Sequence, residues 1–103
     1  MIKFNKLVRD NIPEIIKNNG QVPHTRVLTE EEYKYALEEK LKEEVHEYIS
    51  DNSIEELADV LEVLDAIVQL NKFSWQEIVD KKNIKKEQRG GFSKRLFLID
   101  RTE

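Results

Sequence analysis

The chain has 103 residues, a length that predicts one domain over residues 1–103 with a modest core. It contains no cysteine, which excludes disulfide frameworks, thiolate zinc sites and cysteine nucleophiles, and its net charge of -4 argues against nonspecific binding to nucleic acid. With no run of about 18 apolar residues and no long apolar stretch at its start, the sequence predicts a cytoplasmic protein without a membrane partner.

In chain order, the first expected element is a short helix near residues 13–18. Pro13 suits a first helical turn, and Gly20 is typical of a helix end. Residues 21–28, which contain Pro23, predict a loop. Glu, Lys, Leu and Ala dominate the rest of the chain and alternating β-branched runs are scarce, so the expected fold class is all-α.

Three longer helices are predicted at residues 29–50, 53–71 and 74–88. Each begins with a Ser or Thr followed three residues later by Glu, the pattern of a reciprocal helix cap. These pairs are Thr29 with Glu32, Ser53 with Glu56, and Ser74 with Glu77. Residues 92–99 predict a short extended C-terminal tail, within which residues 95–99 are the one plausible strand.

The second helix places a carboxylate among apolar residues. At about 100° per residue, Glu44 falls within the apolar stripe and Glu47 on its flank. Burying an unpaired carboxylate costs several kcal/mol, so Glu44 needs a partner. The other residues of that stripe are Leu37, Leu41, Val45 and Tyr48.

The third helix is apolar around most of its circumference, and Glu56 and Asp59 lie on one of its apolar faces. The connection at residues 50–53 is short, so the second and third helices should form an antiparallel hairpin. Pairs at i and i+3 share a face, so the four acids can converge. Hard oxygen ligands favour Mg²⁺, with Mn²⁺ as the other candidate.

Simpler interpretations of these acids stay open. Glu56 is the third residue of a predicted cap, which alone gives it a helical role. Glu47 could be a surface residue. Acids are concentrated over residues 30–65, whereas the charged residues within 81–95 are all basic apart from Glu87. Solvated helix faces would also account for such runs.

The Glu44–Glu47 and Glu56–Asp59 pairs resemble the ExxE and ExxD motifs of the all-α nucleoside-triphosphate pyrophosphohydrolases. This MazG-like superfamily includes phosphoribosyl-ATP pyrophosphohydrolase and helical dUTPases. Residues 6–16, KLVRDNIPEII, resemble the opening of a MazG-like subgroup, and residues 89–92, RGGF, resemble a C-terminal signature of similar proteins. The eight-residue gap between the two motifs is shorter than in many relatives.

The resemblance implies hydrolysis between the α and β phosphates of a nucleoside triphosphate, as in house-cleaning enzymes, or of phosphoribosyl-ATP. It implies a homodimer or homotetramer that completes an antiparallel helical bundle. It also implies Mg²⁺ ligation by Glu44, Glu47, Glu56 and Asp59, with Glu44 and Glu47 as the catalytic candidates. The basic candidates for binding the substrate phosphates are Lys6, Arg9, Lys86, Arg89, Lys94 and Arg95.

Two other functions compete with hydrolysis. A di-iron carboxylate bundle would use Glu43 and His46 as a Glu-x-x-His motif, but it needs two such motifs and His46 is expected to point away from the apolar stripe. A non-catalytic helical interaction module would use the third helix as a dimer interface. The sequence does not predict which nucleotide would be hydrolysed.

Overall fold

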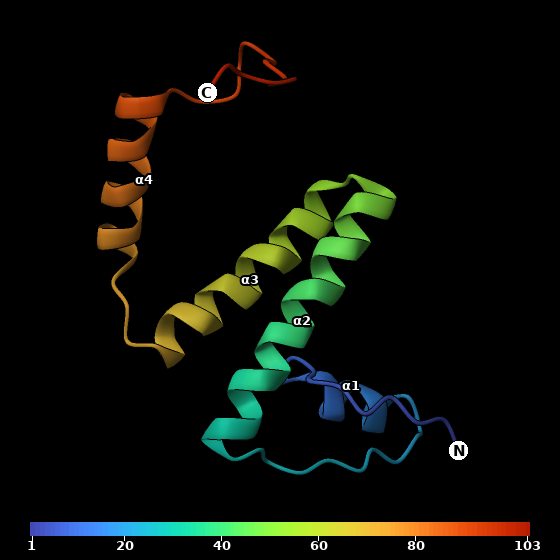
Figure 1. Cartoon of the computed structure of the whole chain (residues 1–103). Helices are drawn as coiled ribbons and strands as arrows, with labels where there is room; N and C mark the ends of the chain where they lie inside the picture. The colour runs from blue at the N-terminus through green and yellow to red at the C-terminus, as the bar shows by residue number, and fades with distance from the viewer. The chain divides into compact units, whose positions relative to one another are not determined.

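The computed structural model describes all residues 1–103 and is all-α (Figure 1). It contains four helices and no strand: α1 (Ile12–Asn18), α2 (Glu30–Asp51), α3 (Ile54–Leu70) and α4 (Trp75–Arg89). The chain groups into two compact units, residues 1–71 and residues 72–103, which are described separately. The single-domain organisation stays a prediction.

The predicted cap residues precede α2, α3 and α4. Thr29 accepts a hydrogen bond from the Glu32 backbone N–H, and the Glu32 carboxylate accepts one from the Thr29 N–H, so this capping box is complete. Ser53 and Ser74 likewise accept from the residue three positions later, but neither cap is closed by its glutamate side chain. The sequence pattern therefore located three helix starts, while only one reciprocal box formed.

Helices α2 and α3 form the predicted antiparallel hairpin and lie side by side in Figure 1. Asn52 turns the chain in the left-handed conformation, with φ of 55°, and its backbone N–H and its side-chain amide both donate to the Tyr48 carbonyl. Leu37 of α2 and Val63 and Val68 of α3 are the buried apolar residues. This small core positions the two helices that carry the predicted acids.

A second apolar face of α3 is left uncovered. Ile54, Leu57 and Leu61 follow one another at helical spacing and are 82%, 51% and 55% exposed. The sequence predicted that α3 is apolar on most of its circumference, and the hairpin covers only part of it. Exposed apolar surface of this kind commonly marks an interaction site.

The first unit begins with residues 1–11, followed by α1. Pro13 lies in the first turn of α1, as predicted, and Gly20 follows the end of the helix with φ of 81°. The Ile12 N–H donates to the Arg9 carbonyl at 3.1 Å, which ties the Arg9 backbone to the start of the helix.

The second unit consists of α4 and the residues around it. Gly90 ends α4 with φ of 84°, and its N–H donates to the Lys86 carbonyl. The strand predicted at residues 95–99 does not form, because a strand needs a partner strand for its backbone hydrogen bonds and the structure has none. No helix of the chain combines the length and apolar character needed to span a membrane.

Candidate carboxylate metal site

The structure brings together three of the four predicted acids. One carboxylate oxygen each from Glu44, Glu56 and Asp59 lies within 4.8 Å of the others. Glu44 comes from α2, whereas Glu56 and Asp59 come from the first two turns of α3. These residues are referred to below as the carboxylate cluster. Their convergence follows from the tight turn at Asn52, which sets the end of α2 beside the start of α3.

Glu44 is the buried member of the cluster. The residue is 9% exposed, as expected for a position inside the apolar stripe of α2. Lys40, one helical turn earlier, reaches the Glu44 carboxylate with Nζ 3.4 Å from Oε1. The side chain of Lys40 is itself only 15% exposed, so this pair is shielded from water and supplies the counter-charge that a buried carboxylate requires.

Glu56 takes part in the cap of α3 through its backbone and not through its carboxylate. Its backbone N–H donates to Ser53 Oγ at 3.3 Å, but its carboxylate does not return a bond to the Ser53 N–H. The carboxylate lies instead in the cluster with Glu44 and Asp59. The side chain is therefore available to a ligand.

Glu47 lies at the edge of the site. It is exposed, and its carboxylate is not among the three converging oxygens. Its charge nevertheless contributes to the electrostatic surroundings of Glu56. Its assignment as a ligand or a base therefore stays a prediction.

The pKa of Glu56 is raised above its usual value. Desolvation is the largest cause, followed by the negative charges of Asp59, Glu47, Asp51 and Glu44. Glu56 forms no salt bridge, whereas Glu44 and Asp59 each have one. The cluster thus carries more negative charge than its cations offset, which favours binding of a proton or another cation.

Arg9 supplies the second cation at the cluster. Its Nη2 donates to Asp59 Oδ1 at 2.8 Å, which links the segment before α1 to the start of α3. Nearby, Lys6 Nζ donates to Glu43 Oε1 at 3.0 Å, and Lys40 Nζ donates to the other Glu43 oxygen at 3.2 Å. Glu43 therefore accepts from two lysines, one in the segment before α1 and one in α2.

Lys40 was not identified from the sequence, and Glu43 was considered only as part of the Glu-x-x-His motif, not as a partner of lysines. Burial raises the pKa of Glu43, but the hydrogen bonds from Lys6 and Lys40 outweigh it, so the net pKa is lowered. The spacing of Lys40 from Glu43 and Glu44, at i+3 and i+4, is the signal that could have identified this pairing. The contact with Lys6 spans 37 positions and has no such local signal.

The remaining basic candidates belong to the second unit. Lys86 and Arg89 lie in the last turn of α4, and Lys94 and Arg95 follow it. All four are exposed. Their assignment as phosphate-binding residues stays a prediction. His46 is also exposed, in line with its expected direction away from the apolar stripe.

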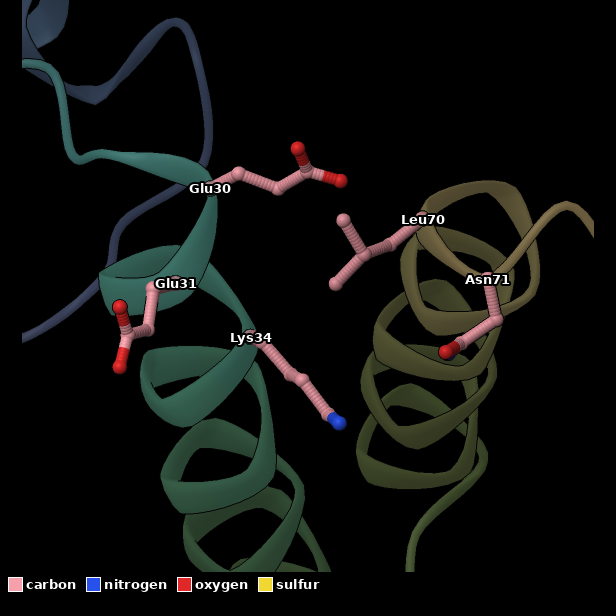
Figure 2. Close-up of a pocket in the computed structure, with 5 residues that line it drawn as sticks. All are labelled: Glu30, Glu31, Lys34, Leu70 and Asn71. Carbon is pink, nitrogen blue, oxygen red and sulfur yellow. The ribbon is translucent and has the colours of Figure 1, made fainter.

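The hollow drawn in Figure 2 lies away from the cluster. It is formed where α2 begins and α3 ends, by Glu30, Glu31, Lys34, Leu70 and Asn71. In Figure 2, Glu30 and Lys34 extend toward the helix that carries Leu70, whereas Glu31 points away. A second hollow is formed by α1 and the loop after it. Neither contains a predicted site residue, and a Mg²⁺ site needs converging oxygens rather than an enclosed cavity.

Comparison with known proteins finds one short match. A stretch of 42 residues is 52% identical to an uncharacterized protein of Mycolicibacterium smegmatis (strain ATCC 700084 / mc(2)155). It covers 41% of this chain and 43% of that protein, so the match spans less than half of either. No family model matches the chain. No solved structure matches it either.

Proposed function

We propose that the protein is a Mg²⁺-dependent nucleoside-triphosphate pyrophosphohydrolase that releases a nucleoside monophosphate and pyrophosphate. The observation that carries the proposal is the convergence of Glu44, Glu56 and Asp59 within 4.8 Å on two packed helices. The sequence resemblance adds the reaction type. In this proposal the substrate is a nucleoside triphosphate or phosphoribosyl-ATP.

The donor set fits Mg²⁺ or Mn²⁺. All three converging groups are carboxylates, and hard divalent cations bind oxygen ligands. The positive groups of Arg9 and Lys40 already lie against Asp59 and Glu44, which supports an attraction of this site for cations. Glu44, Glu56 and Asp59 would hold the metal, and Glu47 is the fourth candidate ligand. When bound, the metal would neutralise charge on the phosphate oxygens.

The reaction would be an attack of water on the α-phosphorus. A bond forms between the water oxygen and that phosphorus, and the bond from the α-phosphorus to the bridging oxygen breaks, so that pyrophosphate leaves with the electron pair. Glu47, exposed beside the cluster, is the proposed acceptor of the water proton. Within the first unit, Lys6 and Arg9 would bind the phosphates.

We further propose that the chain functions as a homodimer or homotetramer. Ile54, Leu57 and Leu61 leave an apolar face of α3 exposed, and a second copy could cover it. The same face supports the alternative function, a non-catalytic interaction module. Sedimentation or light scattering would test the assembly: a monomer at micromolar concentration would contradict it.

A pyrophosphate-release assay over nucleoside triphosphates with Mg²⁺ tests the activity. We expect turnover by the natural protein and none by the Glu44→Gln, Asp59→Asn double variant. Glu30→Gln, Glu31→Gln is the matched control, because it removes two acids from the opposite end of the hairpin. Folded protein that is inactive on every nucleotide tested would favour the interaction module.

A further inference from the structure

We infer that Arg9 is an exchangeable partner of the carboxylate cluster, which holds Asp59 until a divalent ion binds and then contacts the substrate phosphates. This inference rests on the proposed function and adds an order of events to it. It assigns Arg9 two successive partners, an acid of the protein and a phosphate of the substrate.

The Arg9–Asp59 contact is suited to exchange. Only one guanidinium nitrogen is used, Nη2, at 2.8 Å from Asp59 Oδ1. The two side chains are 56% and 40% exposed, and exposed ion pairs contribute little net stability. A divalent ion that needs the Asp59 oxygen therefore has a weak competitor.

Lys40 is the contrasting cation. It touches both Glu43 and Glu44, and its side chain is only 15% exposed. Removing it from these acids would leave charges shielded from water, which is costly. Of the two cations at the cluster, Arg9 is therefore the one that can be displaced.

The exchange requires side-chain rotation only. The Arg9 backbone carbonyl accepts from the Ile12 N–H at the start of α1, so the main chain is held at this point. The side chain is long and its guanidinium lies at the edge of the cluster. Phosphates held against a metal at the cluster would lie close to this released guanidinium, whose planar set of donors suits phosphate oxygens.

Two affinities test the inference, and they should change in opposite directions. Mg²⁺ binding measured by calorimetry without nucleotide should become about two- to fivefold tighter in Arg9→Ala, because the competitor is gone. Binding of inorganic tripolyphosphate at saturating Mg²⁺ should become about tenfold or more weaker, because a charge-assisted contact is lost. Arg9→Gln, which retains more of the side chain, should behave in the same way.

Arg26→Ala is the matched control. Arg26 also forms an exposed pair at 2.8 Å with a helical acid, Glu32, so the variant removes one arginine and one comparable ion pair. We expect neither affinity to change. Mg²⁺ affinity that is unchanged or weaker in both Arg9 variants would overturn the exchange, and unchanged tripolyphosphate affinity would overturn the phosphate contact. If the natural protein itself binds no Mg²⁺, the proposed metal site fails instead.

Discussion

Glu32 and Glu56 occupy the same position in the same sequence motif, yet their carboxylates have opposite surroundings. Glu32 closes its capping box and pairs with both terminal nitrogens of Arg26, at 3.0 and 2.8 Å. Glu56 leaves its box open and lies among other acids. The hydrogen bond from Arg26 is the largest cause that lowers the pKa of Glu32 to about 2, whereas the pKa of Glu56 is raised.

This difference teaches that tertiary packing, rather than the motif, decides what a cap glutamate does. The partners of Glu32 are local, because Arg26 and Thr29 lie within six residues of it. The neighbours of Glu56 include Glu44, which reaches it only because α2 and α3 pack as a hairpin. Local contacts therefore hold the Glu32 carboxylate in its cap, whereas the hairpin places the Glu56 carboxylate among other acids.

The largest expected effect is on Mg²⁺ binding by the two glutamine variants. Glu56→Gln removes a proposed ligand, whereas Glu32→Gln makes the same chemical change at the other cap. Because even groups that only orient metal ligands contribute about 10- to 100-fold to affinity, we expect Glu56→Gln to weaken Mg²⁺ binding by at least tenfold. Glu32→Gln should keep the affinity of the natural protein. Calorimetry measures both, and equal affinities in the two variants would exclude Glu56 as a ligand.

The next largest effect is on the packing of α2 against α3, which brings Glu44 close to Glu56. Leu37→Ala removes a buried side chain from a core with few apolar members, and we expect a loss of about 2–5 kcal/mol in the free energy of unfolding. Urea unfolding measures it. Leu61→Ala is the control for an exposed leucine and should cost far less in a monomer. A large, concentration-dependent cost of Leu61→Ala would instead indicate that a second copy covers this face.

A smaller effect is expected at the caps. Thr29→Ala and Ser53→Ala each remove a side-chain acceptor at a helix start, which typically costs about 1 kcal/mol. Thr29→Ala should cost more, because it disrupts a complete box, whereas the Ser53 cap has only one of the two bonds. Thermal unfolding followed by circular dichroism compares them. A larger cost for Ser53→Ala would show that the open box is the more important cap.

Much of the fold could be predicted because its signals are local. The residues Thr29, Ser53 and Ser74 located three helix starts, and the short connection before Ser53 predicted the hairpin. The convergence of Glu44, Glu56 and Asp59 followed from helical periodicity and that hairpin. Each of these inferences needed only residues close in sequence or helices joined by a short turn.

The rest of the site depends on contacts that have no sequence period. Arg9 pairs with Asp59 across 50 positions, and Lys6 pairs with Glu43 across 37. Both basic residues were predicted to bind phosphate, but their acidic partners were not predicted. Periodicity also gave no means to decide whether Glu56 would close its cap, because that choice depends on the charge of neighbouring helices.

The smallest expected effect is opposite pH dependence at the two caps, measured without divalent ions. Glu32 has a folded pKa of about 2 against a usual value of 4.5, so its contribution to stability is present above pH 4.5 and is lost as the pH falls toward about 2. Glu56 has a folded pKa above 4.5, so its contribution becomes less favourable as the pH rises through that folded pKa. Urea unfolding across a pH series measures the difference in the free energy of unfolding between the natural protein and each glutamine variant. The two differences should change with pH in opposite directions, the Glu32 difference below pH 4.5 and the Glu56 difference above it. For Glu32 the difference should shrink on acidification, whereas for Glu56 it should move in favour of the natural protein. A Glu56 difference that moves against the natural protein on acidification, as for Glu32, would mean that Glu56 has a stabilising cation partner and that the two caps are alike.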